Sequence, residues 1–185
     1  MKKLIITSLF VISVLSNTYA QFTKIGGGVA LSSGFPFHNM PYDANKSGII
    51  AVSFKGLYEI NTTLHISPSF TFFYPHITQE LSTKTNVSSL MFDINGHYVF
   101  NSLEKFEFYV LAGFDMLYTN KKETSGSIIF KESDNALGLN IGVGTYMKVT
   151  EQLNFFGEAK YIFSRYDQFM INAGVFLNID WMKKN

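Results

Sequence analysis

The chain has 185 residues, of which 16% are aromatic, with 19 Phe, 10 Tyr and one Trp. That length suggests a single domain. The absence of cysteine excludes disulfides, thiolate metal sites and a lipid anchor on Cys. A formal net charge of +1 gives no electrostatic reason to expect nucleic acid as a partner.

The first 20 residues have the pattern of a secretory signal peptide. Two lysines precede an apolar run over residues 4–15, and small residues lead up to Ala20. We therefore expect cleavage before Gln21 and a mature domain over residues 21–185. A retained membrane anchor is the alternative, but the apolar run is too short to span a bilayer.

Beyond this segment, eight stretches alternate apolar and polar residues with a period of two. Such alternation over about ten residues predicts a strand with one apolar and one polar face. A tilted strand of that length also spans a bilayer. Pro68 interrupts the third stretch, since proline removes a ladder donor. The predicted strands are residues 24–33, 48–59, 63–74, 86–100, 106–118, 136–147, 153–164 and 169–181.

The connections between these strands alternate in length. Long loops are predicted over residues 34–47, 75–85 and 119–135, whereas the turns after the second, fourth and sixth strands are short. Outer-membrane barrels combine short periplasmic turns with longer outer loops, and an even strand count places both ends of the barrel on the periplasmic side. Aromatic residues recur where the apolar faces end, as interfacial girdles require.

A soluble lipocalin-like binder of hydrophobic ligands would also have eight antiparallel strands. Its apolar face lines the cavity and its outer face is charged. Here the polar face is crowded with Gly, Ser, Asn and Thr and carries few charges, which favours a packed interior. The pattern therefore predicts an all-β fold, an eight-stranded, antiparallel, up-and-down transmembrane β-barrel with its apolar face toward lipid.

Several stretches resemble the small outer-membrane β-barrel family, the OmpA/OmpX/OmpW-like "porin family" of Bacteroidetes-type bacteria. They read FDINGHYVF, FYVLAGF, LGLNIGVGTYMKVTEQLNFFGEAKYIF and FMINAGVFLNI. The resemblance implies a monomer in the outer membrane of a Gram-negative bacterium, surrounded by lipid and lipopolysaccharide and inserted by the barrel-assembly machinery. That machinery reads a terminal aromatic residue, and here Trp181 is followed by residues 182–185.

The alternation places charged and histidine side chains in the lumen. Eight strands leave room only for side chains, so charges of both signs are expected to pair and plug the barrel. A narrow solute or ion pore lined by the same groups is the alternative. The predicted set is Lys55, Glu59, His65, Asp93, His97, Glu107, Asp115, Glu158 and Lys160.

Chemistry beyond this network has weak support in the sequence. A lipid A-modifying hydrolase would need the inward-facing pair His65 and Ser67, with Glu59 or Asp93 orienting the histidine. The spacing of the four His residues suggests no metal site, and no cofactor motif occurs. We expect a structural or surface-interaction role without catalysis. The outer loops, including Phe35, Phe37, Tyr42 and residues 121–134, are candidates for contact with a surface partner.

Overall fold

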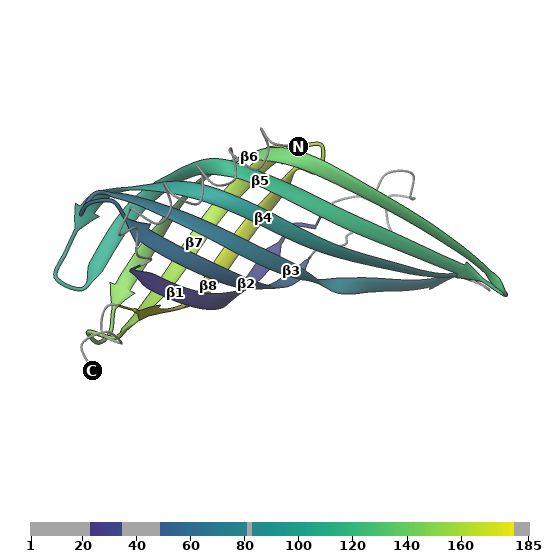
Figure 1. Ribbon diagram of the computed structural model, residues 1–185, viewed down its shortest axis with the longest axis horizontal. Helices are drawn as coiled ribbons and strands as arrows, with labels where there is room; N and C mark the ends of the chain where they lie inside the picture. The colour runs from purple at the N-terminus through teal and green to yellow at the C-terminus, as the bar shows by residue number, and fades with distance from the viewer. Residues whose placement is uncertain (1–22, 35–48, 81–82, 180–185) are drawn as a thin grey trace, which may run out of the picture.

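The computed structural model describes residues 23–34, 49–80 and 83–179. The predicted signal peptide, the aromatic loop over residues 35–42 and Trp181 lie outside these ranges. Among the described residues, no helix is long and apolar enough to cross a membrane. The strands are β1 (Lys24–Ser32), β2 (Ile50–Glu59), β3 (Leu64–Glu80), β4 (Thr83–Ser102), β5 (Phe106–Ser125), β6 (Ile128–Lys148), β7 (Leu153–Ser164) and β8 (Gln168–Asn178) (Figure 1).

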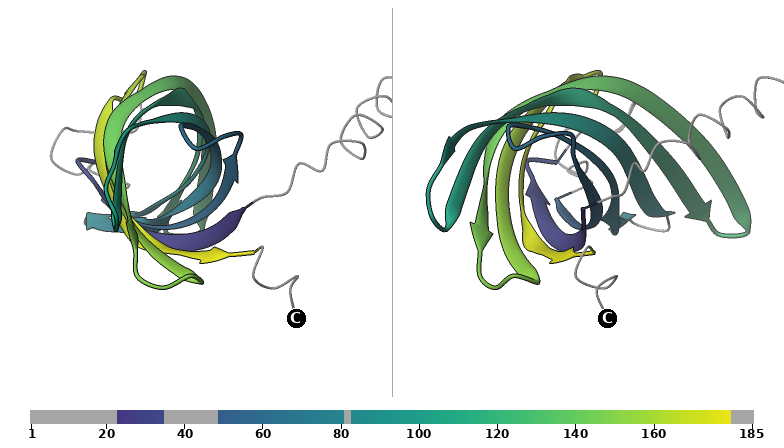
Figure 2. Two further views of the ribbon diagram at one scale, coloured as in Figure 1. Left: turned by 90° about the vertical axis from the view of Figure 1, so that its left-hand side faces the viewer. Right: turned by 60° about the vertical axis from the view of Figure 1, so that its left-hand side comes forward.

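The strands form a single closed sheet. Each strand pairs antiparallel with its neighbours in the chain, and β1 pairs with β8, so the meander closes on itself. Figure 2 shows the strands following one another around the ring. The predicted eight-stranded, antiparallel, up-and-down barrel is confirmed.

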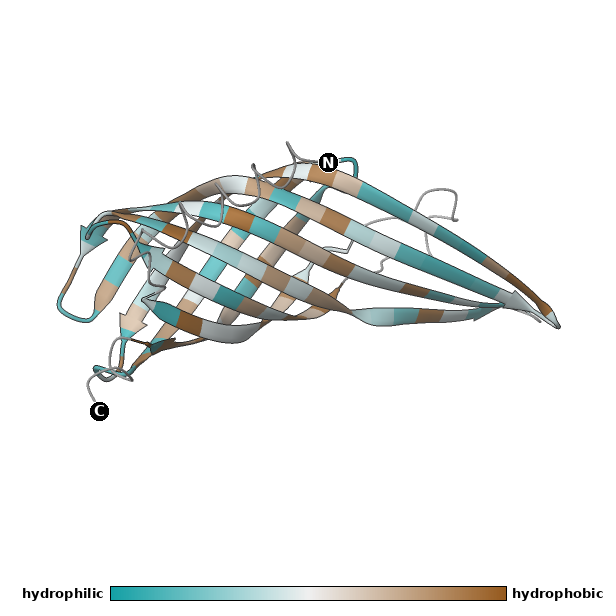
Figure 3. Cartoon of the chain, viewed as in Figure 1, coloured by the Kyte–Doolittle hydropathy of each residue, from teal (hydrophilic) through white to brown (hydrophobic). Residues whose placement is uncertain are grey.

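Side chains alternate between the outside and the inside of this ring. On β5, Phe114 and Met116 are 71% and 46% exposed, whereas Asp115 and Leu117 are 3% and 1% exposed. The same alternation gives the banded hydropathy of the strands in Figure 3. The exposed side chains are apolar and many of the buried ones are polar, which is the reverse of a lipocalin.

Four strands are much longer than the others. β3 to β6 have 17 to 21 residues, whereas β1, β2, β7 and β8 have 9 to 12. The additional residues extend from one end of the barrel as a tapering projection (Figure 1). We call this part, residues 74–80, 83–89, 119–125 and 128–136, the projecting sheet.

The projecting sheet shows that two of the predicted loops are wrong. Residues 75–85 belong largely to the paired ends of β3 and β4, and residues 119–135 form the ends of β5 and β6 around a turn at Gly126, whose φ is +59°. Water meets both faces of a sheet beyond the bilayer, so polar residues occupy both faces and the period-two signal disappears.

The opposite end of the barrel has the short turns predicted from the sequence. In the β2–β3 turn, Asn61 Oδ1 accepts hydrogen bonds from the backbone N–H groups of Thr63 and Leu64, both at 2.8 Å. β1 begins and β8 ends at this same end, where Lys24 pairs with Asn178. The expectation that both ends of the barrel chain share the side of the short turns is confirmed.

Pro68 lies within β3, where the sequence predicted a local weakness. The pairing of β2 with β3 is interrupted opposite it, between Lys55 and Tyr58, and resumes in the same register. On the other side, Pro68 remains opposite Ile94 of β4. Because proline has no N–H to donate, it is accommodated here by leaving one side of the ladder open.

The barrel lumen as candidate functional site

A buried ion pair crosses the middle of the lumen from β2 to β7. Lys55 Nζ lies 2.8 and 2.9 Å from the two carboxylate oxygens of Glu158. Their side chains are only 2% and 1% exposed. The Tyr109 hydroxyl donates a further hydrogen bond of 3.2 Å to Glu158 Oε2. Glu158 is therefore held by a cation and a hydroxyl, as a buried charge requires.

A second buried ion pair joins β4 to β7. Lys160 Nζ lies 3.1 Å from Asp93 Oδ1, and the Ser69 hydroxyl donates to Asp93 Oδ2 at 2.8 Å. Asn95 also donates to Asp93 and accepts a hydrogen bond of 2.9 Å from Asn140. Four of the predicted residues thus form two ion pairs within one polar layer.

The remaining acidic residues of the predicted set lie elsewhere along the lumen. Glu59 forms an ion pair of 2.6 Å with Lys24 at the end with the short turns, where Glu107 is half-buried. Asp115 is buried opposite Asp93 in the β4–β5 register, and its carboxylate oxygens have no hydrogen-bond partner among the described residues. These three carboxylates do not join the Lys55–Glu158 pair.

The two predicted lumen histidines are cross-strand neighbours on β3 and β4. The ring of His97 stacks on Tyr109 with centroids 4.4 Å apart, and its Nδ1 shares a hydrogen bond with the Tyr146 hydroxyl. His65 Nδ1 and the Ser67 hydroxyl have no hydrogen-bond partner in the described chain. His65 and Ser67 therefore lack the mutual hydrogen bond that would activate a nucleophile. Within the described ranges, no three metal-ligating side chains gather.

Two apolar clusters that were not predicted from the sequence lie on either side of this polar layer. Along the inward face of β7, Phe156, Glu158, Lys160 and Ile162 follow one another, so the charges lie between apolar side chains. These clusters could have been predicted from the sequence, because large apolar residues such as Phe156 and Ile162 occupy positions that the alternation places in the lumen. The cluster toward the projecting sheet is Ala30, Ala51, Phe73, Met91, Leu117, Ala136, Ile162, Tyr166 and Met170. The cluster toward the short turns is Leu57, Val99, Tyr109, Leu111, Tyr146, Phe156 and Phe176.

Glycines on β6 make room for the large lumen side chains. A Cβ at Gly144 would lie 2.3 Å from the Tyr109 ring, and a Cβ at Gly138 would lie 2.2 Å from Asp115 Oδ1. Each glycine faces that side chain across the β5–β6 ladder. These glycines are thus close-packing positions within a strand.

A closed antiparallel ring of eight strands, with apolar side chains outside and a polar layer inside, defines a membrane β-barrel protein. Residues 4–180 match the model of the outer membrane protein beta-barrel domain, so the chain belongs to that family. We therefore place the protein in the outer membrane. No curated protein sequence matches the chain significantly.

Solved structures with the same fold are distant in sequence. Ail, the attachment invasion locus protein of Yersinia pestis, is 17% identical over 83% of this chain and 95% of Ail, with a TM-score of 0.56. The N-terminal β-barrel domain of Pseudomonas aeruginosa OprF is 14% identical over 84% of this chain and 97% of that domain, with a TM-score of 0.53. Neisserial surface protein A is 15% identical over 84% and 94%, with a TM-score of 0.52. At these identities the likeness concerns the fold alone.

Proposed function

We propose that the protein is a closed outer-membrane barrel with a structural or surface-interaction role and a lumen plugged by its own side chains. The main support for this proposal is that two buried ion pairs, Lys55–Glu158 and Lys160–Asp93, lie between two apolar clusters. A hydrated pore would leave its charges in contact with water, whereas these four side chains are at most 2% exposed.

The surface-interaction part of the proposal concerns the projecting sheet. This sheet carries four long strands beyond the barrel. Its far part, residues 122–135, contains no buried side chain and is available for contact with a partner (Figure 1). Ail, which has the same fold, has been crystallised with the heparin analogue sucrose octasulfate. A barrel of this architecture is thus compatible with a surface-binding role.

The proposal includes the route to the membrane. Residues 1–20 are a signal peptide cleaved before Gln21, and the barrel-assembly machinery of a Gram-negative, Bacteroidetes-type bacterium inserts residues 21–185 as a monomer. The composition of residues 1–20 supports this route. N-terminal sequencing of the protein purified from outer membranes is expected to begin at Gln21, and a sequence beginning at Met1 would contradict it.

Single-channel recording in planar bilayers tests the plug. The wild-type protein, shown to be folded by its altered mobility in SDS without boiling, is expected to give no conductance steps. The double variant Lys55→Ala/Glu158→Ala removes the central pair and is expected to pass ions. Steps from the wild-type protein that change in size with Glu158→Gln would instead establish the narrow pore.

A further inference from the structure

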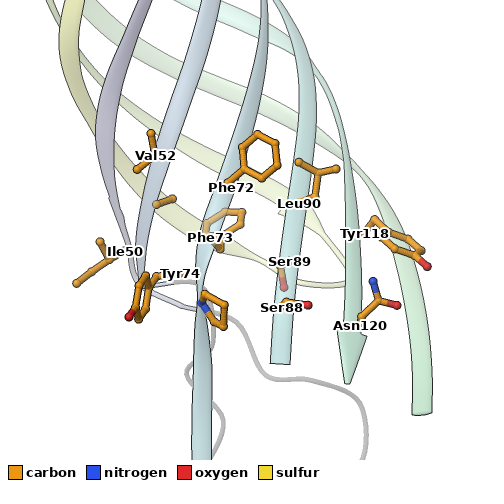
Figure 4. Close-up of a pocket in the computed structure, with 12 residues that line it drawn as sticks. Ile50, Val52, Phe72, Phe73, Tyr74, Ser88, Ser89, Leu90, Tyr118 and Asn120 are labelled. Atoms are coloured by element: carbon orange, nitrogen blue, oxygen red, sulfur yellow. The ribbon is translucent and has the colours of Figure 1, made fainter. Parts of the chain in front are cut away.

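A groove runs along the outer surface of the barrel where the projecting sheet begins. It lies across β2, β3, β4 and β5, has a volume of about 560 Å³, and is lined by apolar and aromatic side chains (Figure 4). Tyr74 and Ile50 at its edge are 77% and 56% exposed. The β3–β4 register shifts between Phe73 and His76, and β2 begins at Ile50, so the irregularity lies beside the start of the shorter strand.

The groove continues into a basic hollow on the same outer face. Ser88 and Asn120 line both the groove and this second hollow, whose volume is about 330 Å³. Lys122 and Lys131 line the second hollow and are directly opposite each other in the β5–β6 register. Strand alternation places Lys122 on the same face as Asn120, toward the outside of the barrel.

The charge of this hollow is unbalanced. Its lining contains three lysines and one carboxylate, Glu132. Lys121 forms an ion pair of 2.6 Å with Glu123, whereas no ion pair within the described residues involves Lys122 or Lys131. Like charges directly opposite each other across a ladder are destabilising, and an anion bridging both ammonium groups would relieve the repulsion.

The position of the two hollows specifies the occupant. The apolar groove lies on the lipid-facing surface, at the level of Tyr74 and Tyr118, where aromatic girdles mark the edge of the bilayer. Lys122 is four residues beyond Tyr118, or about 13 Å along an extended strand. A phosphorylated lipid of the outer leaflet spans that distance, with an acyl chain at one end and an anionic headgroup at the other.

We propose that this surface binds one phosphorylated outer-leaflet lipid. Its phosphate lies between Lys122 and Lys131, and one acyl chain occupies the groove between Phe72 and Leu90. Ser88 and Asn120 face the region where the headgroup meets the chain. This site is independent of the lumen plug, so a conducting barrel would leave it unaffected.

Native mass spectrometry of the full protein in detergent tests the site, with diphosphoryl lipid A as the probe. We expect wild-type protein to retain one lipid, and Lys122→Gln/Lys131→Gln to weaken its binding at least tenfold. The control Lys105→Gln/Lys148→Gln removes the same charge at the opposite end of the barrel and is expected to bind like wild type. Ser88→Phe, which fills the junction of the two hollows, is expected to weaken binding without altering cold-SDS mobility.

Two further measurements test whether the site needs the whole lipid or only its phosphate or its acyl chains. Lipid A stripped of phosphate is expected to bind at least tenfold more weakly, and millimolar inorganic phosphate is expected to displace little of the intact lipid. The proposal is overturned if both double variants lose binding equally, if phosphate removal has no effect, or if inorganic phosphate alone competes fully.

Discussion

At the scale of single residues, the most constrained group is the Glu158 carboxylate. It accepts hydrogen bonds from Lys55 and Tyr109 in a layer closed off from water. Its partners come from β2 and β5, so this carboxylate on β7 links strands that are not adjacent in the ring. Its contribution is best measured by removing its charge while keeping its shape.

Glu158→Gln is expected to destabilise the barrel by about 3–5 kcal/mol, because it leaves the Lys55 ammonium buried without a counter-charge. Urea unfolding in lipid bilayers, followed by circular dichroism, measures this free energy. Lys55→Met/Glu158→Leu removes both charges and is expected to recover most of the loss. Glu151→Gln, in an exposed turn, serves as the control, and an equal effect there would contradict the prediction.

A second residue-scale prediction concerns acid sensitivity at the outer rim. Asp134 lies on β6 beyond the membrane-spanning part of the strand, and the Tyr166 hydroxyl donates a hydrogen bond to it. This hydrogen bond, with those from the Asn135 N–H and Arg165, lowers the pKa of Asp134 below its usual 3.8. The ionised carboxylate therefore stabilises the folded rim above about pH 4, and this stabilisation is lost as the pH falls through the lowered pKa.

The pKa of Asp134 is measurable from the pH dependence of its side-chain carboxyl ¹³C shift. The midpoint is expected below 3.8 in the wild-type protein and closer to 3.8 in Tyr166→Phe, which keeps the ring and removes the donor. Tyr98→Phe, which removes an exposed hydroxyl elsewhere, is the control. An unchanged midpoint in Tyr166→Phe would show that the hydroxyl does not stabilise the ionised form.

At the scale of elements, the barrel and the projecting sheet are stabilised by different interactions. The barrel strands are fixed by lipid on one side and a packed lumen on the other. The β5–β6 end is held instead by its ladder, by the pairing of β5 with β4, and by the contacts of Asp134 with Arg165 and Tyr166. Within the described residues, β7 pairs with β6 only from Gly138 onward, so the end of β6 lacks a partner on that side. Removal of residues 121–132 therefore leaves both lumen ion pairs and the Asp134–Tyr166 hydrogen bond in place.

Replacing residues 121–132 with Asn-Gly joins Asn120 to Ser133, which already face each other, through a favoured two-residue turn. We expect the shortened protein to keep its cold-SDS mobility and to change its unfolding free energy by no more than about 1 kcal/mol. The matched control deletes the paired segments 111–116 and 137–142, again 12 residues, from the apolar band. This control is expected not to fold, and a failure of both proteins would contradict the distinction.

At the scale of the whole molecule, the sequence predicts whatever depends on local pattern. The lipid-facing register of β5 follows from alternation, since a shift of one residue would bury Phe114 and expose Asp115. The ion-pair partner of Lys55 could not be predicted in this way, because Glu158 is 103 residues away in the chain and meets Lys55 only across the closed ring. The projecting sheet was not predicted either, because residues 122–135 have exposed or half-buried side chains on both faces and carry no period-two signal.

The pairing of β1 with β8 makes the order of strands cyclic. At the end with the short turns, the backbone N–H of Ile179 donates to the carbonyl of Thr23 at 2.9 Å, so the two outermost described positions touch. A few linking residues there, with the chain cut instead at the 165–167 turn, would give a circular permutant with the same neighbours throughout. The folded barrel therefore does not depend on which strand comes first in the chain, and only export and membrane insertion would depend on that order.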